Sequence, residues 1–136
     1  MNLSAQNNGR NRLWYLAQPF SKYEGGIKEA FEVGSREAAR LIKLRIPVFA
    51  PIPHSYPIAL YGDISQLDHS VWLPADQPLI DACTGIIVLR MKGWDESFGV
   101  AYEIDQFAKA GKPRIDMEVG TVPAEFLPGG RFAPGA

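Results

Sequence analysis

The chain has 136 residues, of which 46% are hydrophobic and 21% are charged, and its formal net charge is -1. This size and composition predict one ordinary globular domain with enough apolar material for a single core, and they leave no room for a second domain. The near-neutral charge and the lack of a Lys or Arg run argue against duplex nucleic acid as a partner, and no apolar stretch approaches the roughly 20 residues that cross a bilayer.

The beginning of the chain, residues 1–12, is polar and has no apolar signal core, so we expect a disordered tail and a cytoplasmic protein. The single cysteine, Cys83, excludes an internal disulfide and a cysteine-rich metal site, and its place at a predicted helix end favours a small apolar filler. His54 and His69 have no carboxylate partners at a recognisable spacing, so we expect no metal and no other cofactor.

The ordered part begins with a predicted strand over 13–17, which ends at a turn containing Pro19 and the Gly25-Gly26 pair. A helix is predicted over 27–45, and a short second strand over 48–50 follows Pro47. The inner side of the helix is formed by residues at helical spacing, namely Ile27, Phe31, Gly34, Ala38, Leu41 and Arg45.

A proline-rich segment follows the second strand. Pro51, Pro53 and Pro57 predict that 51–66 is a long irregular loop. Loops of more than about 12 residues within a compact domain are often functional. This one carries His54, Ser55, Tyr56 and Tyr61, so we expect it to form a lid or a pocket wall.

The rest of the chain alternates between helix and strand. A short helix is predicted through 80–83, a third strand over 85–89, a helix from Ser97 onward and a last strand over 114–117. This alternation predicts a parallel sheet with helices on both faces. The Pro/Gly-rich tail over 120–136 is expected to cross the surface or to contact a neighbouring subunit.

Glu103 lies in the helix that follows the third strand. In open α/β sheets, ligands bind beyond the carboxyl ends of the strands, so the loop before this helix is where a ligand is expected. At about 100° per residue, Glu103 is about 60° from the apolar direction of Val100, Ile104 and Phe107. Two interpretations are open here: a rim glutamate with its head in water, or a site carboxylate.

Three patches of the chain stand out together. They are Tyr15-Leu16-Ala17-Gln18-Pro19-Phe20-Ser21, Asp76, and Ser97-Phe98-Gly99-Val100-Ala101-Tyr102-Glu103. In these patches the chain resembles the nucleoside 2-deoxyribosyltransferase superfamily, in particular a branch described only as a domain of unknown function. The resemblance spans about 13–115 and implies a flavodoxin-like (Rossmann-like) three-layer sandwich, with a parallel sheet of about four or five strands, in a single domain over 13–119.

The resemblance also implies an activity, which is cleavage or transfer of the N-glycosidic bond of a nucleoside or a nucleoside 5'-monophosphate. Glu103 is then the nucleophile that attacks the anomeric carbon, and Asp76 is its catalytic partner. The residue types suit this chemistry, because a carboxylate stabilises an oxocarbenium-like centre and the leaving base needs a proton. For Asp76 the alternative is a capping residue of a helix that has Pro78 in its first turn.

Ser97 bears on whether the substrate is phosphorylated. Deoxyribosyltransferases typically have an aspartate six residues before the glutamate, whereas the related deoxynucleoside 5'-monophosphate hydrolases have a serine, so the resemblance favours a monophosphate. A serine at a helix start can hold a phosphate, but it can equally be an ordinary N-cap. The hydrolases' arginine-bearing loop is replaced here by Gln18-Pro19-Phe20-Ser21-Lys22, and Asp95-Glu96 adds negative charge against a phosphate.

The substrate-binding residues expected from the resemblance and from their side-chain chemistry are Tyr15, Gln18, Phe20, Ser21, Trp94, Ser97 and Gly99. For the aromatic members a core position is the alternative. A nucleotide-binding module that has lost catalysis is the alternative to an enzyme, and a partner protein without a small-molecule site is a third. The resemblance further implies a homodimer or a higher homo-oligomer, to which the segment around Phe126 and Leu127 could contribute.

Overall fold

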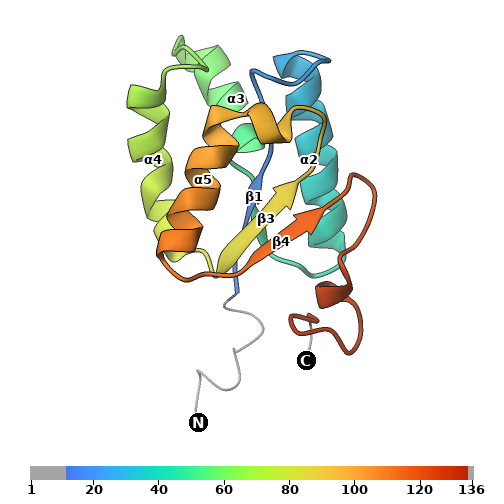
Figure 1. Ribbon diagram of the computed structural model, residues 1–136. Coiled ribbons are helices and arrows are strands. Elements are labelled where there is room, and N and C mark those ends of the chain that lie inside the picture. The colour runs from blue at the N-terminus through green and yellow to red at the C-terminus, as the bar shows by residue number, and fades with distance from the viewer. Residues whose placement is uncertain (1–11, 135–136) are drawn as a thin grey trace.

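A computed structural model describes residues 12–134, in which strands and helices alternate (Figure 1). The strands are β1 (Trp14–Ala17), β2 (Val48–Phe49), β3 (Gly85–Leu89) and β4 (Arg114–Met117). The helices are α2 (Ile27–Lys43), α3 (Pro51–Gly62), α4 (His69–Ala82) and α5 (Phe98–Lys109), with short 3-10 helices η1 (Trp94–Glu96) and η2 (Ala124–Phe126). Of the disordered tail expected over 1–12, all but Arg12 lies outside the described residues.

The four strands form one parallel sheet in the order β2-β1-β3-β4. Trp14 pairs with Val48 on one side of β1 and with Gly85 on the other. The chain therefore leaves β1 toward one edge of the sheet, forms β2, and returns past β1 to form β3. Such a reversal opens a crevice at the carboxyl ends of the two strands beside it, which is where open α/β sheets bind ligands.

Helices cover both faces of the sheet (Figure 1). Trp14 and Leu16 of β1 pack on the α2 side, whereas Tyr15 and Ala17 pack on the side of α4 and α5. Because both faces are covered, every residue of β1 and β3 is buried, as their continuous apolar runs predict. The predicted α/β three-layer sandwich of Rossmann-like type is confirmed.

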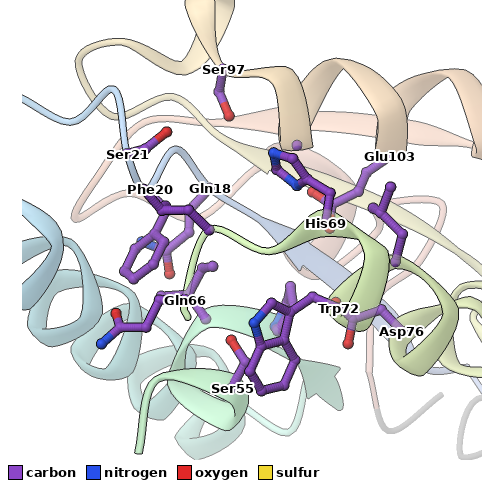
Figure 2. A pocket seen from close by; sticks show the side chains of 15 residues that line it. Gln18, Phe20, Ser21, Ser55, Gln66, His69, Trp72, Asp76, Ser97 and Glu103 are labelled. Carbon is purple, nitrogen blue, oxygen red and sulfur yellow. The ribbon is translucent and has the colours of Figure 1, made fainter. Parts of the chain in front are cut away.

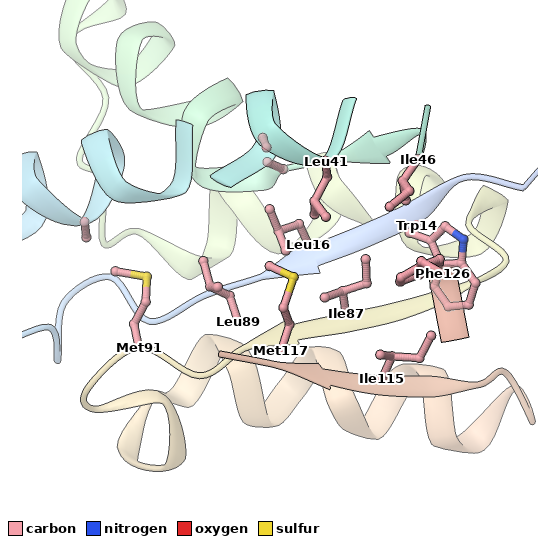
Figure 3. Packing of buried hydrophobic residues seen from close by; sticks show 13 residues of the cluster. Trp14, Leu16, Leu41, Ile46, Ile87, Leu89, Met91, Ile115, Met117 and Phe126 are labelled. Atoms are coloured by element: carbon pink, nitrogen blue, oxygen red, sulfur yellow. The ribbon is translucent and has the colours of Figure 1, made fainter. Parts of the chain in front are cut away.

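The α2-side core includes a residue that follows β4, Phe126 (Figure 3). Phe126 of η2 is buried, and its ring meets that of Trp14 edge-to-face with centroids 5.2 Å apart. The Pro/Gly-rich segment after Gly120 therefore packs its aromatic side chain into the chain's own core, and does not merely cross the surface as expected. Apolar burial of this ring outweighs the lack of regular structure around it.

Helix α2 packs through small residues, since its inward side carries Ala30, Gly34, Ala38 and Leu41. It ends at Lys43, two residues earlier than predicted, because Arg45 adopts a left-handed backbone with φ of 67°. The buried side also holds Glu37, which was not expected. Its carboxylate accepts hydrogen bonds from Arg40 and from the Gly120 backbone N–H, so it joins α2 to the chain after β4.

Gln18 ties the end of β1 to α2. Its side-chain Nε2 donates to the Ala30 carbonyl oxygen at 2.8 Å, and its Oε1 lies against Gly34. A Cβ added at Gly34 would overlap this oxygen. Glycine is therefore required at 34 for close approach, although it lowers the intrinsic stability of a helix interior.

The expectation of a long irregular loop over 51–66 was wrong, because 51–62 forms α3. Pro51 and Pro53 fall in its first turn, where backbone N–H groups have no intrahelical partner to lose. Pro57 removes one interior bond, and the helix ends at Asp63 in a left-handed conformation. A cluster of prolines at a helix start is thus compatible with the helix that follows.

Helix α4 is also longer than predicted and begins at His69 rather than near 80. Asp68 caps it, since its Oδ1 accepts from the Ser70 backbone N–H at 3.1 Å. Pro74 and Pro78 lie inside the helix, four residues apart and both exposed. The carbonyl groups that they leave without a partner face solvent, so water can satisfy them.

Cys83 is buried at the end of α4, as its predicted role of apolar filler requires. Among residues 12–134, no helix has the length and apolar character needed to span a bilayer.

We predict that Gly34→Ala destabilises the protein by about 1–2 kcal/mol, because the cost of displacing the Gln18 amide exceeds the gain of about 1 kcal/mol in helix propensity. Chemical denaturation measures the change. Gly99→Ala is the matched control, since a Cβ there meets only Ser97 Oγ at an ordinary 3.9 Å. A Gly34→Ala protein as stable as the wild type would contradict the role given to Gln18.

Candidate active site

A partly open pocket lies at the carboxyl ends of β1 and β3, in the crevice where the strand order reverses (Figure 2). It is lined by the β1–α2 loop, the start of α3, the α3–α4 connection, one face of α4 and the start of α5. Seven of the nine expected site residues line it: Gln18, Phe20, Ser21, Asp76, Ser97, Gly99 and Glu103. The pocket thus brings the three sequence patches together.

Glu103 is a buried residue on the inner face of α5, with a side chain that reaches the pocket. The interpretation as a rim glutamate with its head in water was therefore wrong. It rested on an apolar stripe of Val100, Ile104 and Phe107, which Ala108 extends by one residue. The structure exposes Ala108 and only half buries Ile104, so the buried stripe is rotated toward Glu103.

Tyr15 holds the Glu103 carboxyl. The side chain of Tyr15 is fully buried on the α5 side of β1, and its hydroxyl donates a hydrogen bond to Glu103 Oε2. The rings of Phe49 and Phe107 pack against it, with centroids 5.8 Å and 5.6 Å away. Burial and the neighbouring carboxylates raise the pKa of the Tyr15 hydroxyl, so it stays a donor across the physiological range. Tyr15 therefore supports the site from the core.

The two carboxyl groups of the pocket have shifted proton affinities. Burial raises the pKa of Glu103 to about 8, with the charge of Asp76 adding to the rise and the Tyr15 hydrogen bond opposing it. Burial also raises the pKa of Asp76 to about 6, and nearby His54 moderates that rise. Between these values the pair holds one proton, so one acid and one carboxylate are present together.

Asp76 is in the middle of α4, one helical turn after Trp72. The alternative interpretation of Asp76 as a helix cap was wrong, since the helix begins earlier and Asp68 caps it. Half-buried and facing the pocket, Asp76 is free to act on a ligand.

Ser97 fits both interpretations that the sequence left open. It is the N-cap of α5, where its Oγ accepts from the Val100 backbone N–H at 3.2 Å. It also lines the pocket, next to Gly99. The hydroxyl proton of Ser97 remains available to a ligand, because only its oxygen is used in the cap.

The β1–α2 loop contributes Gln18, Phe20 and Ser21 to the pocket. The Gln18 amide is engaged with α2, so this residue shapes the pocket rather than offering a free side chain. Lys22 is exposed and does not line the pocket.

Trp94 lies away from the pocket, and its expected stacking on a base is not supported by its position. It belongs to η1 and is partly buried against the α5-side core. The guanidinium groups of Arg90 and Arg114 lie 4.7 Å and 5.8 Å from its ring centroid, so cation–π contacts occupy it.

Sequence reasoning missed several pocket residues on α4 and before it. Trp72 and His69 line the pocket, and the His69 ring lies 4.7 Å from that of Phe98 at the start of α5. A signal for them exists, since His69, Trp72 and Asp76 recur at helical spacing. It was missed because the prolines at 74 and 78 led to a predicted helix that begins after these residues.

The expectation that 51–66 forms a pocket wall is confirmed, although by a helix and a short connection. Ser55 and Gln66 line the pocket with the apolar Pro51 and Ile52. Neither His54 nor the tyrosines of this segment belongs to the lining. Gln66 has a buried side-chain oxygen, Oε1, without a hydrogen-bond partner.

The charge of the lining is acidic. In the part of the chain that the structure describes, no Lys or Arg borders the pocket, so His69 is the one lining residue there that can become positively charged. Residues 12–134 also contain no group of three or more His, Cys, Asp or Glu side chains placed to hold a metal ion. The chemistry that the pocket offers is that of two carboxyl groups, hydroxyl groups and aromatic faces.

Comparisons with known proteins identify a family without an assigned activity. A family model described as "Domain of unknown function (DUF1937)" matches residues 12–119. No curated protein matches the chain. The matched range contains every residue of the pocket described above. The resemblance to the nucleoside 2-deoxyribosyltransferase superfamily stays a prediction.

We predict that Glu103→Gln stabilises the protein above pH 7 and flattens its stability against pH. The carboxyl group ionises near its ordinary pKa of 4.5 in the unfolded chain but near 8 in the folded one. The native state therefore binds the extra proton, and the free energy of unfolding falls as pH rises from about 4.5 to 8, by on the order of 4 kcal/mol.

Urea denaturation at several pH values measures this slope for the wild type and the variant. Glu32→Gln, at an exposed position on α2, is the control and should keep the wild-type slope. If the Glu103→Gln protein shows the wild-type slope as well, the buried carboxyl group does not have the raised pKa.

Proposed function

Given that the chain belongs to the DUF1937 family, a domain of unknown function, we propose that it cleaves or transfers the N-glycosidic bond of a nucleoside or a nucleoside 5'-monophosphate. The observation that supports this most is the pairing of the buried Glu103 with the half-buried Asp76 in one pocket, with Tyr15 hydrogen-bonded to Glu103. The superfamily resemblance of these positions supports the same reaction.

The reaction needs two carboxyl groups in different protonation states. Breaking an N-glycosidic bond develops positive charge at the anomeric carbon, which a carboxylate stabilises or captures, while the departing base takes up a proton. A positioned acid for that proton contributes roughly 10² to 10⁴ in rate. The separated pKa values of Glu103 and Asp76 supply both forms near neutral pH.

We assign the nucleophile to Glu103 and the proton transfer to Asp76. The Tyr15 hydrogen bond favours the ionised form of Glu103 and fixes its carboxyl group in one orientation. Asp76 is half-buried on the pocket side of α4, within reach of a leaving group and of solvent protons. In the free protein the single proton of the pair sits on Glu103, whose pKa is the higher of the two. The assignment therefore requires that this proton is on Asp76 in the reacting complex.

The proposal includes the other expectations drawn from the sequence and the resemblance, which are a small-molecule substrate, a cytoplasmic location and a homo-oligomer. Ser97 at the start of α5 supports a monophosphate, since helix N-termini favour anions. The absence of Lys and Arg from the lining described here supports a free nucleoside. Both remain within the proposed substrate class.

We predict that base is released from at least one member of a panel of ribo- and deoxyribonucleosides and their 5'-monophosphates, tested with and without a second free base. Chromatography detects the released or exchanged base. Glu103→Gln should lower the rate by about 10³-fold or more, because it removes the nucleophile, whereas Glu32→Gln should leave it unchanged. Full activity of a folded Glu103→Gln protein would refute the proposal.

Saturable binding of one panel member without any product would favour the second candidate, a binding module that has lost catalysis. The ligand would then raise the melting temperature through mass action.

We predict a bell-shaped dependence of kcat/KM on pH, with apparent pKa values near 6 and 8 and a maximum near 7. Below the lower value both carboxyl groups are protonated and no nucleophile is present; above the upper value both are ionised and no acid is present. Initial rates from pH 5 to 9 measure the profile. Asp76→Asn should abolish one limb, and a profile that is flat over this range would contradict the paired-carboxyl assignment.

A further inference from the structure

We propose that the pocket contains a base-recognition subsite on the α3–α4 connection and α4, in which the face of Trp72 stacks on a planar heteroaromatic base and Gln66 Oε1 accepts a hydrogen bond from an N–H group of that base. The inference rests on the proposed function for its ligand class. Neither the resemblance nor the sequence patterns assigned a role to Trp72 or Gln66.

The pocket has two chemically different ends (Figure 2). Asp76 and Glu103 lie together at one end. Phe20 and Gln66 lie at the other, and Trp72 and Ser55 lie between the two ends along one side. One end therefore offers acid–base chemistry, and the other offers aromatic surface with neutral hydrogen-bonding groups. A nucleoside has the same division between its glycosidic bond and the far edge of its base.

Gln66 is the residue whose hydrogen bonding is incomplete. Two buried side-chain polar atoms among residues 12–134 have no partner, Gln18 Oε1 and Gln66 Oε1, and both residues line this pocket. Neither oxygen is open to solvent in the free protein, but the Gln18 amide is fixed by its bond to the Ala30 carbonyl oxygen and by its packing against Gly34. The Gln66 side-chain amide makes no hydrogen bond within residues 12–134, so it can turn toward a ligand. A buried acceptor without a partner costs free energy, and a donor on a bound ligand would remove that cost at Gln66.

Trp72 can offer a ligand the face of its ring, because its polar edge already has a partner. Its Nε1 donates to the Ser65 carbonyl oxygen at 2.9 Å. This bond fixes the ring and also anchors the connection that carries Gln66, the next residue. Aromatic faces stack on nucleobases without regard to sequence, because every base has a π surface.

The spacing along α4 links recognition to chemistry. Trp72 and Asp76 are four residues apart, so they project from the same face of the helix. A base stacked on Trp72 has its leaving nitrogen toward the carboxyl pair. With no Lys or Arg in the lining described here, the recognised edge is a neutral one.

Binding of free bases tests the subsite without requiring catalysis. Adenine, hypoxanthine, cytosine and thymine are titrated by calorimetry into the Glu103→Gln protein, which holds no nucleophile. We expect at least one base to bind, with Trp72→Leu weakening the binding about 10-fold or more and Gln66→Ala about 5-fold.

The matched controls are Trp94→Leu, which removes a tryptophan outside the pocket, and Gln77→Ala, which removes a neighbouring amide of α4 that does not line it. Both should leave base affinity within about 2-fold, the spread expected of substitutions without ligand contact. Circular dichroism and the melting temperature confirm that each variant is folded. Because Trp72→Leu also removes the bond to Ser65, Gln66→Ala gives an independent test that leaves α4 unchanged.

The outcomes separate this inference from the proposed function. Base binding that depends on Trp72 and Gln66, in a wild-type protein that cleaves no glycoside, would support the subsite and refute the enzyme. Glycoside cleavage with a KM that neither substitution changes would support the enzyme and overturn the subsite. The subsite is also overturned if no base binds, or if Trp94→Leu weakens binding as much as Trp72→Leu.

Discussion

The hydrogen bond between Tyr15 and Glu103 is the contact on which the site depends, because it joins β1, an inner strand of the sheet, to the first half of α5 inside the core. A carboxyl group in such a place has lost its hydration, and one neutral donor replaces only part of it. Its proton affinity rises for that reason. The bond also requires the sandwich itself, since Tyr15 is buried only because helices cover the face of β1 on which its side chain lies.

The burial of Glu103 makes its ionisation costly to the stability of the fold. A glutamate that ionises in an enclosed position weakens the fold in the pH range in which it becomes charged. Asp76 is less buried and ionises at lower pH, so near neutral pH the pair holds one protonated and one ionised carboxyl group. Residues that keep such a group buried, such as Tyr15 and Phe107, therefore serve the site as well as the core.

The prolines of the middle segment shape the other half of the pocket. Pro51 begins α3 at the end of β2, and Pro74 and Pro78 leave α4 helical because their unbonded carbonyl partners face water. The result is a wall that brings Trp72 and Asp76 to one face of the pocket. Proline has no backbone N–H, which makes it a strong local signal for a helix end, but where that end lies depends on solvent exposure, a tertiary property.

Local pattern by itself determined the alternation of elements, the parallel sheet and the bounds of β3 and β4, since apolar periodicity and β-branched runs depend on near neighbours along the chain. It also placed Ser97 at the start of α5. Only the tertiary structure decided that Glu103 is buried, that Asp76 lies within α4 and that Trp94 is outside the pocket. These three outcomes depend on which face a helix turns to the sheet and which distant side chain covers a ring, and packing between segments far apart in the chain settles both.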